Sequence, residues 1–313
     1  MAEPDNRWER DVIEKTLLAA VTEQRRARRW GIFFKLLGFG YLTLLLLSLA
    51  GWLDDGNLSM VGRHTALVEL SGTLASNAVN ADDIITGLQD AFDDKDTAGV
   101  ILRINSPGGS PVQAGRIYDE MMRLRRKHPH VPLYVVVDDI CASGGYYVAS
   151  AAERIYVDKA SLVGSIGVIM DGFGFTGSMQ KLGVDRRLLI SGANKAFLDP
   201  FSPANPRQQA YAQSMLDEIH QQFIHAVREG RGARLKETPD MFSGLIWTGA
   251  QSVQLGLADG FGSVDSVARD VIHAEKLVDY TPQPGLADRF AHQFGMTLAR
   301  NFNPLSWMDM RLH

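Results

Sequence analysis

Ser143 is the residue whose position in this chain most clearly suggests chemistry. It follows an apolar run, Leu133 to Val137, that is typical of a buried strand, and Gly144-Gly145 after it predicts a turn that opens a helix. A serine hydroxyl at such a junction lies near the free amide groups of a helix N-terminus, which favour negative charge. A serine nucleophile needs a base, yet no histidine occurs between His130 and His220. The chemistry of Ser143 therefore depends on another proton acceptor.

A lysine can act as the base if it is held neutral. Its pKa must then fall from about 10.4 towards about 7–8, which costs about 4 kcal/mol and requires burial among apolar groups. Lys159 stands beside an aspartate in a predicted turn, and Lys181 lies in a segment typical of a solvated helix end. Lys195 has no carboxylate closer in sequence than Asp199, so it is favoured as the base of Ser143. Most lysines are solvated, and a solvated Lys195 stays the alternative.

A pair of glycines could stabilise the oxyanion that forms when a serine attacks a carbonyl. Each backbone amide aimed at that oxygen is worth about 3–4 kcal/mol. Gly108-Gly109, directly after Pro107, can present such amides because glycine permits unusual backbone angles and close approach. A simple tight turn is the alternative. Since the Gly108-Gly109 turn and the Ser143 turn both follow predicted strands, we expect them at one edge of the same sheet.

The elements that must position these residues alternate between strands and helices. This rhythm indicates βαβ units, and therefore an α/β fold with a parallel core sheet and flanking helices. Strands are expected at 65–70, 99–104, 132–137 and 154–157, and helices at 82–94, 112–127 and directly after Ser143. Downstream, Asn205-Pro206 predicts the start of a long helix to about 229. Its apolar stripe is expected to pack on the sheet or on another subunit, and shorter helices are expected at 249–255 and 263–277.

Composition places limits on the function. The chain has 313 residues, 45% of them hydrophobic and 22% charged, as in an ordinary globular protein. A net charge of −4 gives no reason to expect a nucleic-acid partner. The single cysteine, Cys141, excludes an intramolecular disulfide, and its apolar neighbours predict a small buried filler rather than a reactive thiol. Neither a zinc-binding histidine spacing nor a phosphate-binding loop is found, so no metal or cofactor is expected.

An apolar segment near the N-terminus predicts a membrane anchor. Leu36 to Leu53 contains eighteen uncharged residues, which would span about 27 Å of a hydrocarbon core about 30 Å thick. A cleaved signal peptide and a buried soluble helix are the alternatives; the long charged region before the segment argues against the signal peptide. The apolar residues from Val12 to Val21 predict a short amphipathic helix ahead of the span.

The charges beside this segment predict its orientation. Basic residues precede the span and acidic residues follow it, so the N-terminus is expected in the cytoplasm and the rest outside, in a single-pass protein of the inner membrane. The basic residues are Arg25, Arg26, Arg28, Arg29 and Lys35. The predicted organisation is a cytoplasmic segment 1–35, the span 36–53, a linker 54–64, an extracytoplasmic (periplasmic) α/β domain 65–280 and a tail 281–313.

Six blocks between about residues 65 and 275 resemble the short-form signal peptide peptidases of the SppA type. They are Ser106-Pro-Gly-Gly109, Ala142-Ser-Gly-Gly-Tyr-Tyr147, Gly164-Ser-Ile-Gly-Val168, Asn194-Lys-Ala-Phe197, Trp247-Thr-Gly-Ala-Gln251 and Gly256-Leu-Ala-Asp259. The resemblance implies a ClpP/crotonase-type fold and a Ser–Lys dyad, with Ser143 as nucleophile and Lys195 as base. It also implies that Ser165 orients the lysine and that Gly109 contributes to the oxyanion hole. The family forms rings or domes in which the lysine reaches the serine of a neighbouring subunit.

Together these expectations describe a membrane-anchored serine endopeptidase. Its substrates would be remnant signal peptides or other membrane-associated peptides, and it would form a homo-oligomer with shared active sites. Two other functions remain open for the same fold. One is a crotonase-like acyl-thioester enzyme, and the other is an inactive membrane scaffold.

Overall fold

The structure, a computed structural model, describes residues 7–49 and 62–282. The chain divides into two units, one of Met1–Val61 with Pro284–His313 and the other of Gly62–Gln283. In the first unit, a continuous helix α1 (Arg7–Leu49) replaces the expected pair of a short amphipathic helix and a separate span. Within it, Glu23–Leu46 is long and apolar enough to cross a membrane, and none of that stretch is buried. Residues 50–53, most of the linker 54–64 and nearly all of the tail 281–313 lie outside the described residues.

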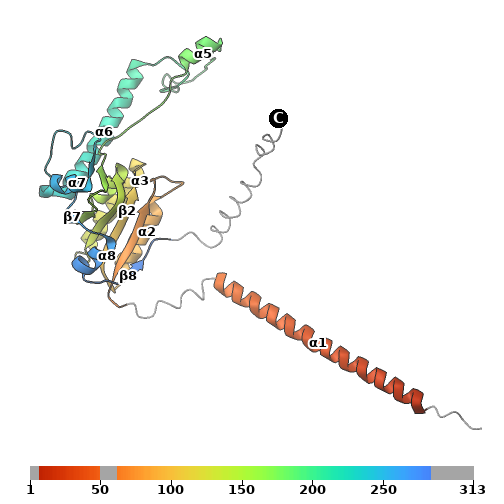
Figure 1. Cartoon of the computed structure of the whole chain (residues 1–313). Helices are drawn as coiled ribbons and strands as arrows, with labels where there is room; N and C mark the ends of the chain where they lie inside the picture. Colours follow the sequence, from red (N-terminus) through yellow and green to blue (C-terminus); the bar gives the residue numbers. More distant parts are fainter. Residues whose placement is uncertain (1–6, 50–61, 283–313) are drawn as a thin grey trace, which may run out of the picture. The chain divides into compact units, whose positions relative to one another are not determined.

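The second unit begins with the predicted alternation of strands and helices. The elements are β1 (His64–Ser71), α2 (Ala81–Asp93), β2 (Thr97–Ser106), α3 (Pro111–Lys127), β3 (Leu133–Ala142), α4 (Gly144–Ala149) and β4 (Arg154–Val157). Side-chain caps explain where α2 and α3 begin, since Asn80 accepts a hydrogen bond from the Asp83 amide and Ser110 accepts one from the Gln113 amide. The expected α/β fold with flanking helices is confirmed (Figure 1).

The sheet branches at β3, and this branching places the Ser143 turn. The strand order is β6-β5-β3-β2-β1-β8, in which β6 is Ile246–Thr248 and β8 is Leu277–Asp279, and all neighbours in it are parallel except β5 and β6. The first half of β3 pairs with β4, whereas its last residues, Ile140 to Ala142, pair with β5 (Leu162–Gly164). β3 thus extends beyond the predicted end at residue 137, and Ser143, which follows it, lies beside the end of β5.

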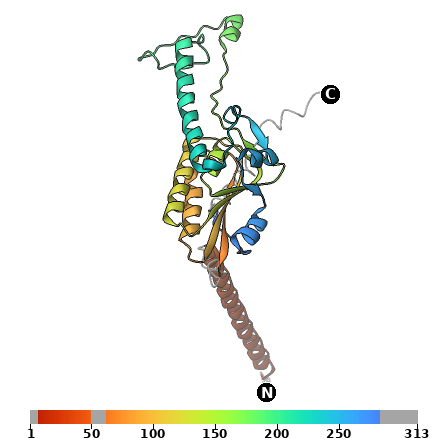
Figure 2. The same cartoon turned by 90° about the vertical axis from the view of Figure 1, so that its left-hand side faces the viewer.

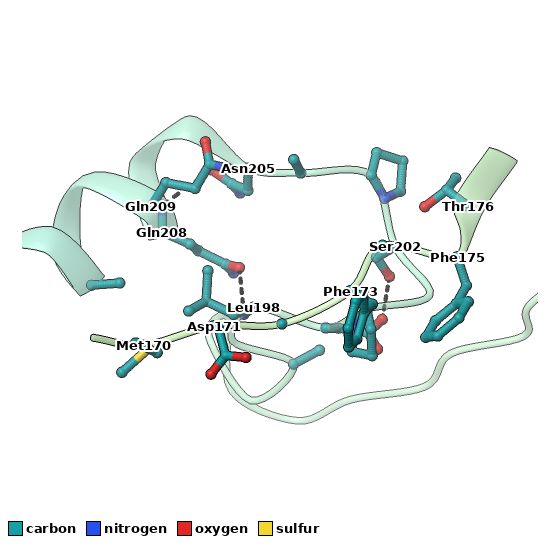
Figure 3. Close-up of a pocket in the computed structure, with 18 of the residues that line it drawn as sticks. Met170, Asp171, Phe173, Phe175, Thr176, Leu198, Ser202, Asn205, Gln208 and Gln209 are labelled. Carbon is teal, nitrogen blue, oxygen red and sulfur yellow. Dashed lines mark hydrogen bonds between the residues drawn. The ribbon is translucent and has the colours of Figure 1, made fainter. Parts of the chain in front are cut away.

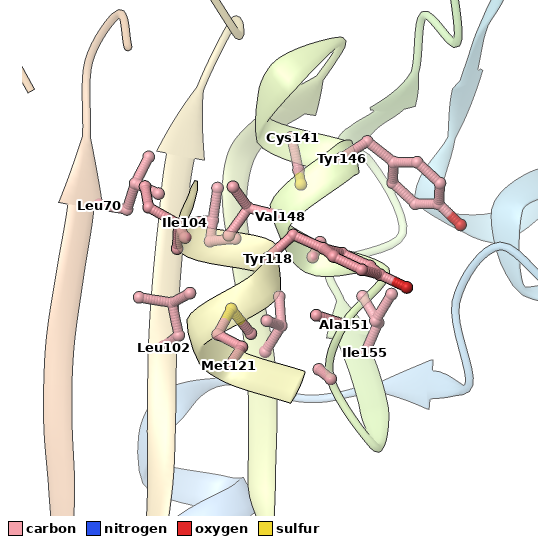
Figure 4. Close-up of a cluster of buried hydrophobic side chains, with 14 of the residues drawn as sticks. Leu70, Leu102, Ile104, Tyr118, Met121, Cys141, Tyr146, Val148, Ala151 and Ile155 are labelled. Atoms are coloured by element: carbon pink, nitrogen blue, oxygen red, sulfur yellow. The ribbon is translucent and has the colours of Figure 1, made fainter. Parts of the chain in front are cut away.

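Two layers of helices cover the sheet on opposite faces (Figure 2). On one face, α2, α3 and α4 enclose the larger core cluster, in which Leu70, Leu102 and Ile104 face Met121 and Val148 (Figure 4). Each such buried aliphatic side chain contributes about 1.5–3 kcal/mol relative to exposure. On the other face, a smaller cluster forms under the C-terminal elements. The core strands are nearly continuous apolar runs because both faces are covered.

The C-terminal elements differ from the predictions in one place. Helix α6 (Pro206–Arg231) begins after its Asn205 cap as expected, and α7 (Gly249–Leu255) has the predicted bounds. The helix expected at 263–277 begins as predicted, after the Ser263 cap, but its predicted end is wrong: α8 (Val264–Ser266) continues as a π-helical turn, η3 (Val267–Ile272), that ends where His273 takes a left-handed conformation. Leu277–Asp279 instead forms β8, which pairs with β1. The remaining elements are α5 (Thr176–Leu182), the 3-10 turn η2 (Gly232–Arg234), β6 (Ile246–Thr248) and β7 (Gly260–Phe261).

Residues 169–205 and the N-terminal half of α6 form an arm that projects from the sheet (Figures 1 and 2). In α6, Phe223 and Val227 of the C-terminal half are buried in the core, so the predicted stripe packs on this unit only there. Tyr211, in the N-terminal half, is 61% exposed. Large apolar side chains of the arm are open to solvent, including Ile169 (84% exposed), Phe173 (79%) and Leu189 (97%).

Candidate active site

Ser143 lies at a strained strand–helix turn. It follows β3 directly, precedes the first residue of α4, and has φ 51° and ψ −123°, a region that non-glycine residues avoid. Two backbone hydrogen bonds hold it there: the Ser143 amide donates to Gly164 O at 2.8 Å, and the Tyr147 amide donates to Ser143 O at 2.9 Å. The residue is only half-buried. Such a turn presents a side-chain hydroxyl at the start of a helix, as hydrolases with a serine nucleophile require.

The Gly108-Gly109 turn packs directly against Ser143. Gly108 has φ 101°, and a Cβ at this position would lie 2.7 Å from both Ser143 Cβ and the Gly144 amide nitrogen. Gly109 has φ 138°, and a Cβ there would collide with the backbone of Leu74. The structure therefore brings the two predicted glycines and Ser143 together, and only glycine fits at that distance.

The amides of the two glycines differ in their hydrogen bonding. The Gly108 amide donates to Ser106 Oγ at 3.1 Å, and Gly108 O accepts from the Leu74 amide at 2.8 Å. No acceptor among the described residues takes the Gly109 amide. This amide nitrogen lies close to Gly144, since a Cβ on Gly144 would be 3.3 Å from it. Gly109 N–H is thus the available donor beside Ser143.

Ser165 is placed near Ser143 by the pairing of β5 with β3. It directly follows Gly164, whose carbonyl accepts from the Ser143 amide, and its own amide donates to Leu245 O at 2.7 Å. A Cβ on Gly164 would meet the Trp247 ring at 2.7 Å, so the strand end is tightly held. Ser165 has φ 51°, like Ser143. Strain of this kind costs about 1–3 kcal/mol and persists where the surrounding structure imposes it.

Lys195 is not brought to Ser143 within one chain. Its side chain is exposed, and its neighbour Phe197 packs on Tyr211 near the outer end of α6, with ring centroids 5.9 Å apart. The Ser143 helix meets α6 elsewhere, where Tyr147 packs on Phe223 at 5.0 Å. Tyr211 and Phe223 are separated by about 18 Å along a helix axis at 1.5 Å per residue. Lys195 is therefore not buried in the single chain, although the predicted role as base requires burial.

The interior beneath Ser143 is largely apolar. Cys141 is fully buried, and burial raises the pKa of its thiol, so the expectation of a buried filler is confirmed. Burial also raises the pKa of the Tyr146 phenol, which donates to Leu257 O at 2.8 Å. Leu257 belongs to the predicted Gly256–Asp259 block, where Asp259 pairs with the fully buried Arg231 of α6 at 2.8 Å. This block therefore joins the base of α6 to the helix that follows Ser143.

One pocket lies in the arm, and no residue of the Ser143 turn belongs to its lining. It has a volume of about 1200 Å³, and Ala193 and Ala196, on either side of Lys195, belong to its lining. Figure 3 shows Phe173 and Leu198 at this pocket, with the Leu198 amide donating to Gln208 Oε1 at 3.1 Å. Among the residues with described side chains, no group of three or more His, Cys, Asp or Glu could hold a metal ion.

Sequence analysis did not single out Ser106 or Leu74. Ser106 is fully buried and contacts the Gly108 turn and the backbone of Gly145. Leu74 binds both ends of the turn, donating to Gly108 O and accepting from the Ser110 amide, each at 2.8 Å. Ser106 does stand first in the Ser106–Gly109 block, which was the one available signal. Leu74 has no such signal because its hydrogen bonds to the turn are made by backbone groups.

The chain has a strained serine at a strand–helix turn, beside a glycine amide in an α/β fold. This arrangement is typical of hydrolases with a serine nucleophile. Residues 125–278 match peptidase family S49. A protein named putative protease slr0021 from Synechocystis sp. (strain PCC 6803) is 30% identical over 201 residues, which are 64% of this chain and 70% of that protein. The chain belongs to peptidase family S49.

Other relatives are longer than the matched region. A putative signal peptide peptidase SppA from Enterococcus faecium is 29% identical over 211 residues, 67% of this chain and 61% of that protein. A protein named Na(+)/H(+) antiporter NhaA from Brucella abortus (strain 2308) is 42% identical over 210 residues, again 67% of this chain but 28% of that protein. The chain thus spans less than two thirds of the length of these two relatives.

One solved structure has a similar backbone fold, and the match covers 72% of this chain and 100% of the chain in that structure. It is a mutant of the 1510-N membrane-bound stomatin-specific protease, with a TM-score of 0.42 and 11% sequence identity. A likeness of that size carries no conclusion about the activity of this chain.

Proposed function

We propose that this chain is a serine endopeptidase in which Ser143 is the nucleophile and Lys195 the base. The observation that carries the proposal is the strained Ser143 turn, packed against Gly108 with the Gly109 amide left without an acceptor among the described residues. Membership of a peptidase family and relatives named as proteases support the reaction class. Ser165, one residue beyond the carbonyl that holds the Ser143 amide, is proposed to orient the lysine by hydrogen bonding.

In the proposed reaction, neutral Lys195 Nζ removes the proton of Ser143 Oγ as this oxygen attacks the peptide carbonyl carbon. The carbonyl oxygen becomes an oxyanion that accepts a hydrogen bond from Gly109 N–H, while Gly108 allows the close approach of that turn. Lys195 then gives its proton to the leaving amine as the C–N bond breaks. Water, deprotonated by Lys195, attacks the carbonyl carbon of the acyl-enzyme ester. The bond from this carbon to Ser143 Oγ breaks, Ser143 Oγ takes the proton back from Lys195, and the second peptide leaves.

The position of Lys195 supports an active site shared between copies of the chain. Lys195 is carried on the projecting arm, whose exposed apolar side chains need a partner surface. We infer that the arm of one copy lies on its neighbour, so that Lys195 approaches Ser143 of the next subunit and is buried there. A ring or dome repeats this head-to-tail contact until it closes.

We propose that α1 anchors the enzyme in the inner membrane, with the N-terminus in the cytoplasm and the α/β domain outside. The apolar stretch Glu23–Leu46 and the arginines in its N-terminal part, Arg25 to Arg29, support this orientation. Tethering raises the local concentration of membrane-resident peptides, which makes remnant signal peptides or other membrane-associated peptides suitable substrates. The relative named signal peptide peptidase agrees with this choice.

Substitution of the two proposed catalytic residues tests the mechanism. Purified full-length Ser143→Ala and Lys195→Ala in detergent micelles should each lose at least about 10³-fold of peptidase activity on a fluorogenic peptide. Lys181→Ala is the matched control, because Lys181 also lies on the arm and is exposed, and it should keep full activity. Activity retained in Ser143→Ala would overturn the assignment, and hydrolysis of acyl-CoA esters instead of peptides would point to the thioester chemistry.

Mixing the two inactive variants tests the shared site. If Ser143 of one copy works with Lys195 of the next, a random equal mixture restores a site wherever the two intact residues meet. The chance is one half times one half, so about a quarter of the wild-type activity should return after subunit exchange. No recovery after exchange, verified by co-purification of differently tagged copies, would place both residues in one chain.

A further inference from the structure

Ser106 is a fully buried serine whose hydroxyl makes two hydrogen bonds to backbone groups. At the end of β2, Ser106 Oγ donates to Gly72 O at 2.6 Å and accepts from the Gly108 amide at 3.1 Å. Gly72 lies in the loop after β1, and its amide donates to Asn105 O at 2.9 Å. The hydroxyl therefore links the β1 loop to the turn that carries the Gly109 amide.

Ser106 also touches the segment that carries Ser143. A Cβ on Gly145 would lie 3.0 Å from Ser106 O, 3.3 Å from its Cβ and 3.6 Å from its Oγ. Gly145 is the second residue of α4, two positions after Ser143. Ser106 is therefore in contact with both halves of the candidate site, the Gly108-Gly109 turn and the nucleophile helix.

The backbone conformation of the Gly108-Gly109 turn depends on contacts with other residues. Glycine populates many backbone conformations, so two adjacent glycines at φ 101° and 138° are not restrained by side-chain sterics. Their orientation depends on outside contacts: Leu74 binds Gly108 O, and Ser106 Oγ binds the Gly108 amide. The Gly109 amide shares a peptide plane with Gly108 O, which Leu74 holds, and Ser106 Oγ holds the preceding plane through the Gly108 amide. Release of either plane would let the backbone rotate at Gly108 and turn the Gly109 amide away from Ser143.

We propose that Ser106 is a positioning residue for the oxyanion hole, acting through the Gly108 amide. The proposal rests on the serine peptidase function proposed above. An apolar residue would be favoured at a fully buried site unless the hydroxyl had a task, because a buried polar group must be paired. One partner of this hydroxyl, Gly108, lies in the turn beside Ser143, and the other, Gly72, lies in the loop after β1. Ser106 thus acts on the donor that the transition state needs and has no contact with the substrate.

Ser106→Ala, compared with Ser252→Ala, tests this role. Ser252 is also fully buried, and its hydroxyl donates to Gly249 O at 2.8 Å in α7, with no contact to the Gly108 turn. In the full-length enzyme, Ser106→Ala should lower kcat about 10- to 100-fold, less than or comparable to the loss of a whole oxyanion donor, with KM within about twofold. Ser252→Ala should leave kcat and KM unchanged. The Tm of each variant measures the loss of stability that follows from removing a buried hydroxyl, so this loss can be compared between the two.

Binding of a transition-state mimic gives a second readout that a merely structural role would not move. A peptide boronate that forms a tetrahedral adduct with Ser143 places an oxygen where the oxyanion develops. Ser106→Ala should weaken its inhibition about 10- to 100-fold and leave the affinity of the matching peptide amide within about twofold. Equal losses for boronate and amide would contradict a role specific to the oxyanion.

Ser106→Cys covers the case in which the alanine variant does not fold. The thiol fills nearly the same space but is a weak donor and acceptor, so kcat should again fall with little change in KM. Wild-type kcat in a folded Ser106 variant, with Ser143→Ala inactive, overturns this inference alone. Peptidase activity retained in Ser143→Ala overturns the proposed function itself, so the two failures are distinguishable.

Discussion

Gly108→Ala is the substitution whose effect follows most directly from the geometry. A Cβ at Gly108 would lie 2.7 Å from Ser143 Cβ and from the Gly144 nitrogen, and 2.8 Å from Ala142 O. Ordinary contacts begin at about 3.4 Å, so the Gly108 turn and the nucleophile turn must separate by about 0.7 Å. The neighbours include backbone atoms, which cannot swing aside as the end of a long side chain can.

Two costs add in this variant. Alanine at a positive φ costs about 1–2 kcal/mol, and the forced separation of packed backbone adds about 1–3 kcal/mol. The free energy of unfolding should therefore fall by about 2–5 kcal/mol, a decrease of roughly 5–20 °C in Tm for a domain of this size. Since a displacement of about 1 Å can cost about 10²-fold in rate, kcat should fall by about 10- to 100-fold or more.

Gly115→Ala supplies the matched control. Gly115 lies in α3, and nothing stands within 4 Å of the Cβ that alanine would add. Alanine is favoured over glycine in a helix by about 0.5–1 kcal/mol, so this variant should be as stable as the wild type or more so. Tm from near-UV circular dichroism and kcat on a fluorogenic peptide would be measured for both. Wild-type Tm and kcat in Gly108→Ala would refute the inferred packing of the two turns.

Three further outcomes are expected. Asp259→Asn removes the charge partner of fully buried Arg231 and should cost about 3–5 kcal/mol of stability in urea unfolding, whereas Asp270→Asn, which breaks an exposed pair, should change nothing measurable. The Cys141 thiol should resist iodoacetamide in the folded protein and react fully in denaturant; rapid labelling without denaturant would contradict its burial. The Tyr280 hydroxyl donates to Asp94 and lowers the pKa of Asp94 below its usual 3.8, so this bond stabilises the fold above about pH 4, and its contribution is lost as the pH falls through the lowered pKa. Tyr280→Phe should therefore be less stable than the wild type at about pH 7 and approach it at about pH 2; a difference independent of pH would contradict this account.

Much of the sheet and its first helices could be predicted from local patterns. The bounds of α2, α3 and α6 agree with the predictions within about two residues, because apolar periodicity and caps such as Asn205 are local signals. The extension of β3 to Ala142 was missed, since Asp138 and Asp139 interrupt its apolar run. These carboxylates are tolerated there because they meet Arg103 and Asn105 on neighbouring β2. Strands of two or three residues, such as β7 and β8, have no signal apart from their distant partners.

The candidate site shows the same division between local and distant information. The turn at Ser143 and the glycines Gly108 and Gly109 are local features, and their meeting follows from parallel strands ending at one edge of a sheet. The spacing of Lys195 left both a buried and a solvated side chain open, because its exposure depends on where a long arm leaves the core. Ser106 has no distinctive sequence signal, because serine is a common residue. Its proposed positioning role is inferred only from its two hydrogen bonds in the structure.

The length of α6 has a consequence for a newly made chain. Its 26 residues extend for about 39 Å, and they hold the Lys195 loop at one end while the other end packs beneath the nucleophile helix. Under the proposed mechanism, a single copy is latent, because α6 holds the proposed nucleophile Ser143 and the proposed base Lys195 apart. Peptidase activity per molecule would rise with concentration and vanish on dilution. Proteins that share the membrane with a lone, unassembled copy would be spared until the assembly closes.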